Sequence, residues 1–120
     1  MEIRTRRVYE GQGPADGLRV LVDRLWPRGL SKDAAAVDVW AKEVAPSSML
    51  RTWFAHREDR FAEFTVRYRA ELEENPAVDE LITQMRPHTV VTLLFGARDT
   101  HLNQAVVLAD YLRGISANWP

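Results

Sequence analysis

The stretch TVVTLLF, residues 89–95, decides the fold of this 120-residue chain. It is almost wholly apolar and rich in residues that favour strands, a pattern typical of a central strand in a parallel sheet. Gly96 follows it and lets the backbone turn out of the sheet. We therefore predict a buried strand over residues 89–95 that opens into a short loop over residues 96–100.

Further strands are predicted on the amino-terminal side of this stretch. LRVLVDRL, residues 18–25, has an apolar centre and predicts a second buried strand. Residues 3–9 predict an edge or solvated strand, since three arginines lie within them, and the Gly-, Pro- and Asp-rich residues 10–17 predict a loop. Residues 37–44 alternate as in a strand but also fit helical spacing, and we take them as a strand.

Apolar residues three and four apart predict helices in the rest of the chain. The helices and helical turns are expected to start at or just after Ser31, Ser47 or Ser48, Phe61, Asn75–Pro76 and Thr100. We expect Gly114 to end the last helix and the tail ISANWP, residues 115–120, to be loose.

Strands and helices in this order indicate an α/β fold. We expect a single three-layer domain over residues 1–120, with a small, mostly parallel sheet of three to four strands covered by helices. Right-handed crossovers predict helices on both faces. Hydrophobic residues make up 46% and charged residues 28%, which excludes a disordered chain.

Charge and cysteine usage exclude several function classes. Sixteen basic and 17 acidic residues give a net charge of −1, so nothing draws the whole chain to nucleic acid or anionic membranes. Without cysteine there is no disulfide, thiolate nucleophile or cysteine-ligated zinc, and the three histidines lack metal-ligand spacing. We expect no metal and no cofactor. The first ten residues lack an apolar run, and no stretch reaches the length of a membrane span, so we expect a cytoplasmic protein with no membrane partner.

Polar side chains follow both predicted buried strands. Asp23, Arg24 and Arg28 follow the first strand, and Arg98, Asp99, His101 and Asn103 follow the second. Ligands of open α/β sheets bind at the carboxyl ends of the strands, so we expect these groups to converge. The arginines are candidates for holding phosphate or carboxylate. Asp23 and Asp99 are candidates for a general base or for positioning a sugar hydroxyl, and His101 for a proton shuttle.

Each of these residues also has a structural interpretation. Asp99 or Thr100 fits a helix cap, and Asp23 and Arg24 fit an ion-pair network at the strand ends. His101 fits an ordinary surface position, and His56 fits a helix cap better than a ligand contact.

The chain resembles the bacterial YeaO-like family of uncharacterised proteins. The resemblance rests on RVY (7–9), DGLRVLVDRLWPRGLSK (16–32), WAKEVAPS (40–47), LRTWF (50–54), FTVRYRAEL (64–72) and VTLLFGARDTHLNQAVVLADYL (91–112). It implies an α/β domain in which DRLWPRG, APS and ARDTHLN are signature blocks. It also implies a strand ending at residues 45–47, which adds Ser47 to the ligand-binding candidates. A wider relative family carries a Cys-His-Arg triplet near the last helix, where this chain has His101, Asn103 and Gln104 and no cysteine, so chemistry that needs that thiol is absent.

These observations leave several functions open. The leading prediction is a small phosphorylated or nucleotide-like ligand that is bound, with or without turnover, at the carboxyl ends of the strands. The alternative is a nucleic-acid-binding or accessory module with Arg4, Arg6, Arg7 and Arg19 on one face and Tyr9 and Trp26 for stacking. A partner-binding subunit without chemistry is the third. The net charge favours the first, and the oligomeric state stays open.

Overall fold

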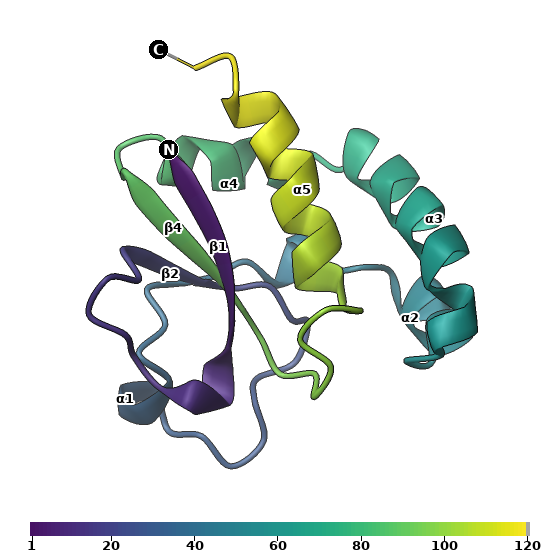
Figure 1. Cartoon of the computed structure of the whole chain (residues 1–120), viewed down its shortest axis with the longest axis horizontal. Coiled ribbons are helices and arrows are strands. Elements are labelled where there is room, and N and C mark those ends of the chain that lie inside the picture. Colours follow the sequence, from purple (N-terminus) through teal and green to yellow (C-terminus); the bar gives the residue numbers. More distant parts are fainter. Residues whose placement is uncertain (120) are drawn as a thin grey trace.

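The computed structural model describes residues 1–119 and confirms the α/β fold (Figure 1). Four parallel strands form one sheet in the order β1-β4-β2-β3. Their bounds are β1 Glu2–Arg7, β2 Leu18–Leu21, β3 Val39–Trp40 and β4 Val90–Phe95. The apolar β4 lies between β1 and β2, and the arginine-rich β1 lies at an edge, as their sequences predict.

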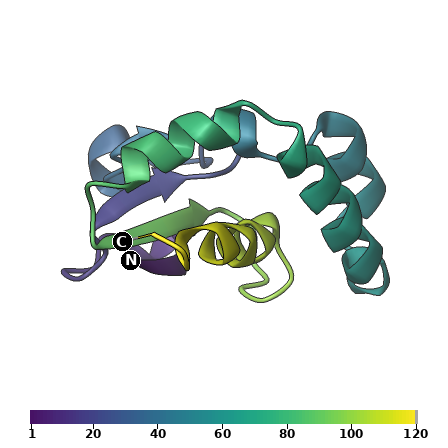
Figure 2. The same cartoon turned by 90° about the horizontal axis from the view of Figure 1, so that it is seen from above.

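Five helices surround the sheet. They are α1 Lys32–Ala35, α2 Ser48–Phe54, α3 Phe61–Glu73, α4 Ala77–Met85 and α5 Gln104–Ser116. Figure 1 shows α5 running alongside β1 and β4, with α3 beyond it. Figure 2 shows α2 and α3 together at the end of the molecule farthest from α1. The Ser31 and Ser47 side chains cap α1 and α2, as predicted.

The main core lies on one face of the sheet. The side chains of Val20, Val91, Leu93 and Phe95 point from β2 and β4 into a cluster that all four longer helices join. Alternate residues of a strand point to the same face, so the two buried strands supply one continuous apolar surface. Within the cluster, the Phe54 ring of α2 stacks on Phe64 of α3 with centroids 4.3 Å apart, and this contact fixes α2 against α3.

The other face of the sheet has a smaller core. Leu21 and Leu94 pack there against Val8 and Ala35, and only the one-turn helix α1 and loops cover them. The crossover from β2 to β3 runs one way across the sheet, and the crossover from β3 to β4 runs back. Right-handed crossovers therefore place α1 on one face and α2, α3 and α4 on the other.

Two predicted strands are too long. Strand β2 ends at Leu21 rather than at residue 25, because the chain then leaves the sheet and Val22 N–H makes a last bond, of 3.0 Å, to the Leu94 carbonyl. Strand β3 pairs only through Val39 and Trp40, since β2 offers it no partner beyond Leu21. Residues 42–44 form a 3-10 turn instead of the expected strand.

The predicted bounds of the last helix are also wrong. Helix α5 starts at Gln104 rather than near Thr100, because the Asp99 side chain first closes a separate turn. It continues through Gly114 to Ser116, since Gly114 keeps a negative φ and so does not make the left-handed helix end. Residues 115 and 116 of the predicted tail therefore belong to α5. The Trp119 ring lies 4.4 Å from the Arg86 guanidinium, and Pro120 lies outside the described residues.

Candidate functional site

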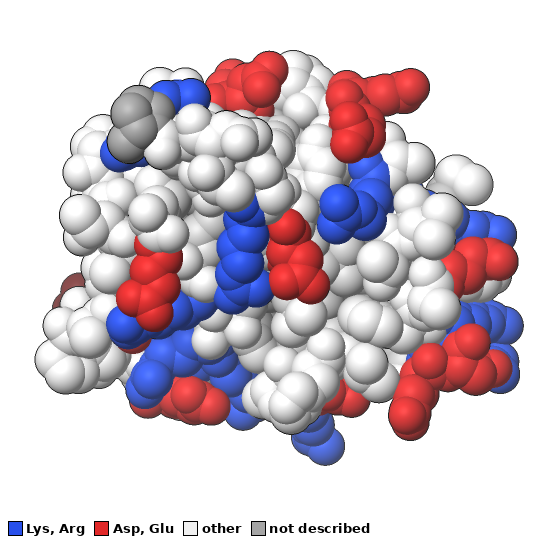
Figure 3. All heavy atoms as spheres, turned by 45° about the horizontal axis from the view of Figure 1, so that its top comes forward, with Lys and Arg blue, Asp and Glu red and all other residues white. Residues whose placement is uncertain are grey.

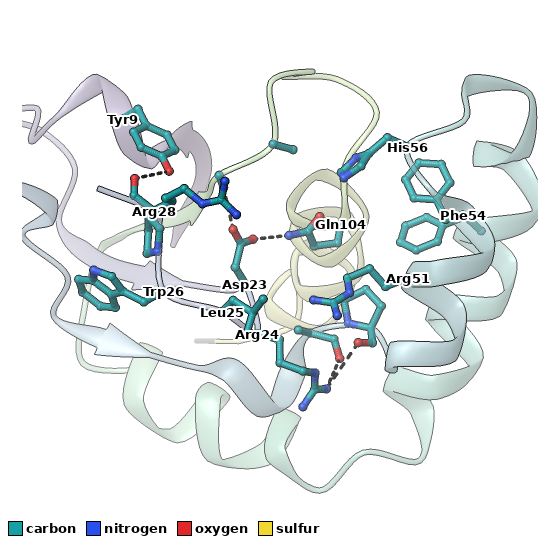
Figure 4. Close-up of a pocket in the computed structure, with 16 residues that line it drawn as sticks. Tyr9, Asp23, Arg24, Leu25, Trp26, Arg28, Arg51, Phe54, His56 and Gln104 are labelled. Carbon is teal, nitrogen blue, oxygen red and sulfur yellow. Dashed lines mark hydrogen bonds between the residues drawn. The ribbon is translucent and has the colours of Figure 1, made fainter. Parts of the chain in front are cut away.

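A pocket with a volume of about 460 Å³ opens at the carboxyl ends of β1, β2 and β4 (Figure 4). Small-molecule sites usually have volumes of about 300–1,000 Å³ and often lie at this edge of a parallel sheet. The lining residues come from the loops after these strands, from the segment around α2, from α3 and from the start of α5: Tyr9, residues 23–28, Ala45, Pro46, Arg51, Phe54, His56, Phe64, Gly96, Ala97 and Gln104.

Asp23 joins three of these segments. One carboxylate oxygen accepts the Gly96 N–H at 2.8 Å, and the other accepts the side-chain amide of Gln104. The Asp23 carbonyl accepts the Trp40 indole N–H at 2.8 Å. A Cβ added at Gly96 would lie 3.0 Å from the same carboxylate, so glycine allows this close approach. Asp23 therefore ties the loop after β2 to the loop after β4 and to the first turn of α5.

Burial of Asp23 raises the pKa of its carboxyl group above the ordinary value. The hydrogen bonds from Gly96 and Gln104 act against this shift, as do the charges of His56 and Arg51, but desolvation is the larger effect. The folded protein therefore binds a proton at Asp23 more tightly than the unfolded chain does.

We expect Asp23→Asn to remove a pH-dependent part of the stability. Because the folded-state pKa is raised, protonation of Asp23 stabilises the fold progressively as the pH falls through that pKa toward the unfolded value. Asparagine can still accept the Gly96 N–H, and the Gln104 amide can turn to accept from it. Thermal melting of both proteins from about pH 7 to about pH 4 measures this effect. The melting temperature of the wild type should rise relative to that of the variant as the pH falls. A melting-temperature difference that does not vary with pH would contradict this.

The three pocket arginines have different roles. Arg24 donates to the carbonyls of Ala45 and Pro46, at 3.2 and 3.5 Å, and so holds the turn that precedes α2. Arg28 and Arg51 are exposed, and Figure 4 shows their guanidinium groups pointing into the pocket from different sides, Arg28 over Asp23 and Arg51 from α2. The structure therefore offers two guanidinium groups to a ligand, with Arg24 fixing the wall between them.

His56 reaches the pocket through an unusual backbone turn. Ala55 and His56 both adopt left-handed backbone conformations, with φ of +47° and +56°. Residues other than glycine rarely adopt such conformations. The Ala55 N–H closes the end of α2 on the Arg51 carbonyl, and the turn directs His56 to the side of the pocket opposite Tyr9 (Figure 4). Such backbone strain concentrates at functional sites.

The structure brings Asp23, Arg24 and Arg28 together, but it places the other candidates elsewhere. Arg98, Asp99 and His101 are exposed on the loop between β4 and α5, and none of them lines the pocket. The Asp99 carboxylate accepts the N–H groups of His101 and Leu102, and these bonds lower its pKa. Asp99 therefore closes a turn of its own before α5, and the cap of that helix, which was expected at Asp99 or Thr100, is Asn103.

Ser47 and Asn103 also have structural partners. Ser47 caps α2 by accepting the Leu50 N–H at 3.1 Å, and its hydroxyl donates to Glu71 at 2.7 Å. Asn103 is completely buried and caps α5 by accepting the Val106 N–H at 3.1 Å. Neither residue lines the pocket, although both lie next to residues that do.

Sequence reasoning missed Tyr9, Arg51, His56 and Gln104 as pocket residues. These four residues come from three separate parts of the chain, and no local pattern joins them. The one available signal was that Tyr9, Arg51 and Gln104 lie in stretches that resemble the YeaO-like family.

The arginines of the nucleic-acid alternative are engaged within the chain. Arg4 binds Glu2 at 2.9 Å, Arg6 donates to the Gly11 carbonyl at 3.1 Å, and Arg7 donates to the Ala97 carbonyl at 3.0 Å. Arg19 is only 1% exposed. On the face that Figure 3 shows, basic and acidic residues lie next to one another rather than in a continuous basic band.

Two other features, a metal site and a membrane-spanning helix, are not found in residues 1–119. This part of the chain contains no group of three histidine, aspartate or glutamate residues placed to hold a metal ion. Nor is any of its helices both long enough and apolar enough to cross a membrane.

The chain is therefore an α/β domain that carries a polar, arginine-lined pocket at the carboxyl edge of its parallel sheet. The chain belongs to the DUF488-N3i family, described as the inactive DUF488-N3 subclade, whose profile matches residues 2–118. This membership agrees with the resemblance to YeaO-like proteins.

Curated relatives of the chain are described as uncharacterised proteins. Proteins of Mycobacterium tuberculosis and Mycobacterium bovis are 46% identical to it over 112 residues, which cover 93% of this chain and 94% of theirs. The uncharacterised protein YeaO of Escherichia coli is 41% identical over 115 residues, covering 96% of this chain and all of YeaO. No solved structure gives a significant match.

Proposed function

We propose that this protein binds a small phosphorylated ligand in the pocket and does not turn it over. The observation that carries the proposal is the pair of exposed guanidinium groups, Arg28 and Arg51, which point into one pocket from different sides (Figure 4). A guanidinium group presents paired N–H donors that match the oxygens of a phosphate, so two of them can hold one phosphate group between them.

The rest of the pocket is compatible with an anion. His56 adds a ring nitrogen that can donate a hydrogen bond. Asp23 is the one acidic residue that lines the pocket, and its raised pKa lessens the charge that it presents as the pH falls. A bound anion and a protonated Asp23 would favour each other.

Binding without turnover is supported by what the chain lacks. It has no cysteine, and its subclade is described as inactive. Asp99 and His101, two of the candidates for acid–base chemistry, lie outside the pocket lining. The third, Asp23, uses both carboxylate oxygens to hold Gly96 and Gln104, which is a structural task.

We expect Arg51→Ala to weaken the binding of inorganic phosphate about ten- to a hundredfold, since a hydrogen bond to a charged group contributes about 1.5–3 kcal/mol. Isothermal titration calorimetry of the full chain measures this loss, and Arg28→Ala should give a similar one. The matched control is Arg67→Ala, which removes the same charge from an exposed position on α3 outside the pocket.

Two results would overturn the proposal. One is equal weakening by Arg67→Ala and Arg51→Ala, which would indicate a general charge effect. The other is no binding of phosphate or of phosphate monoesters to the wild type at millimolar concentration. Arg98→Ala tests where the site lies: an effect as large as that of Arg51→Ala would move the phosphate to the loop between β4 and α5.

A further inference from the structure

One end of the pocket is apolar and partly exposed. It is lined by Tyr9, Leu25, Trp26 and the buried Pro27, here called the apolar rim. Figure 4 shows Tyr9 and Trp26 on the side away from His56 and Phe54, and Leu25 nearer to Asp23. Leu25 is 66% exposed and Tyr9 is 38% exposed. Large apolar side chains that are exposed together at the mouth of a pocket commonly mark a binding surface.

The apolar rim is held in place without a ligand. The Trp26 indole donates to the Leu30 carbonyl at 2.8 Å, and the Tyr9 hydroxyl donates to the Arg28 carbonyl at 2.9 Å. The Trp26 ring also packs edge-on against Trp40 at 5.4 Å between centroids. Leu25 therefore stays exposed on a fixed loop rather than folding into the core, and a preformed surface of this kind loses little entropy on binding.

Asp23 lies at the centre of the pocket, beside Leu25, with Tyr9 and Trp26 on one side of it and His56 on the other (Figure 4). Each of its carboxylate oxygens accepts one hydrogen bond, from Gly96 or from Gln104, and can accept another. A carboxylate at this point favours a ligand group that donates hydrogen bonds, such as a sugar hydroxyl, and disfavours a second anionic group. The pocket thus presents an apolar surface with Arg28 beside it, the Asp23 acceptor at the centre, and Arg51 on the α2 side.

We propose that the ligand is a mononucleotide-like phosphate monoester, an inference that rests on the proposed phosphate binding. Its flat ring lies on the apolar rim and its hydroxyl groups donate to Asp23. Its phosphate lies on the α2 side of Asp23, against Arg51, and Arg28 reaches it from over Asp23. This arrangement puts each part of the ligand against the pocket wall of matching chemistry. A simple inorganic anion would leave the apolar rim and Asp23 unused.

Titration calorimetry of the full chain with four probes tests this inference: AMP, ribose 5-phosphate, adenosine and inorganic phosphate. We expect AMP to bind most tightly. Its affinity should exceed that of ribose 5-phosphate by about five- to 150-fold, the range expected for one base packed on a protein surface. Adenosine should bind more weakly than AMP because it lacks the phosphate.

Leu25→Ser should narrow the ratio of the AMP affinity to the inorganic phosphate affinity. The matched control is Val66→Ser, because Val66 is 68% exposed, as much as Leu25, but lies on α3 outside the pocket. Asp23→Asn should instead narrow the ratio between ribose 5-phosphate and inorganic phosphate.

The possible failures are distinguishable. If phosphate binds in an Arg51-dependent way but AMP binds no more tightly than ribose 5-phosphate, the mononucleotide inference is wrong and the phosphate site stands. If AMP and adenosine bind equally and phosphate does not bind, both proposals are wrong. Equal effects of Leu25→Ser and Val66→Ser would also overturn the mononucleotide inference.

Discussion

Gly17→Ala is expected to destabilise the fold by more than about 4 kcal/mol, which is exceptional for a single substitution. Gly17 has φ of +63°, and a Cβ added there would lie 2.1 Å from the Val90 carbonyl oxygen. That carbonyl cannot move away easily, because Val90 is in register with Glu2 where β1 and β4 pair. An alanine would therefore force apart the loop that enters β2 and the start of the central strand.

Gly11→Ala is the matched control, and urea unfolding measures both variants. Gly11 also has a positive φ, of +76°, but a Cβ there would meet nothing within 4 Å. With ψ of −179°, Gly11 has a backbone conformation that is almost confined to glycine, so its substitution should cost the backbone penalty alone, about 1–3 kcal/mol. Equal destabilisation of the two variants would show that the close approach at Val90 contributes nothing.

Arg19→Ala is expected to destabilise the fold by about 3–5 kcal/mol, because it removes one partner of a buried ion pair. Arg19 and Asp16 are 1% and 5% exposed, and their side chains are in direct contact. The Arg19 guanidinium also donates to the carbonyls of Ala35 and Ala36, at 2.8 and 2.9 Å. Its loss leaves a buried carboxylate and two carbonyls short of donors, on the face that only α1 and loops cover.

The pH dependence gives this substitution a second readout. Burial acts to raise the pKa of Asp16, but the Gly13 N–H and the Arg19 guanidinium together lower it. A lowered folded-state pKa stabilises the fold above the ordinary aspartate value, and this stability is lost as the pH falls through the folded-state pKa. The difference between wild type and Arg19→Ala should therefore be largest near neutral pH and shrink in acid.

Thermal melting should show a decrease of about 10–25 °C for Arg19→Ala at neutral pH. Arg67→Ala is again the control, since it breaks an exposed ion pair with Glu63 and a contact with the Trp53 ring, and it should change stability by no more than about 1–2 kcal/mol. A similar small effect of both substitutions would mean that the buried pair does not stabilise this face.

The buried role of Arg19 bears on the function as well as on the stability. In the sequence, Arg19 belongs with Arg4, Arg6 and Arg7 to an arginine-rich group that suits a nucleic-acid backbone. In the structure it holds α1 and the loop around Asp16 against the sheet. The arginines that remain exposed in a pocket are Arg28 and Arg51, and for this reason the phosphate-binding proposal rests on them.

The sequence by itself determined the elements whose patterns are local. The apolar run of residues 89–95 predicted the central strand β4, because only a strand covered on both faces tolerates so few polar residues. The arginines of residues 3–9 predicted the edge strand β1 in the same way. Helix caps such as Ser47 were predictable because a cap and its partner N–H lie within three residues of each other.

The tertiary structure alone decided which polar side chains share the pocket. Asp23 and Asp99 both follow buried strands and look equivalent in the sequence, yet Asp99 closes a local turn while Asp23 binds Gly96 and Gln104, more than seventy residues away. Arg51 and His56 enter through the packing of α2 against α3 and through a left-handed turn that no propensity predicts. Local hydrogen bonds join residues that are close in the sequence, so the sequence predicts them. A pocket is formed by long-range packing, which the spacing of residues in the sequence does not predict.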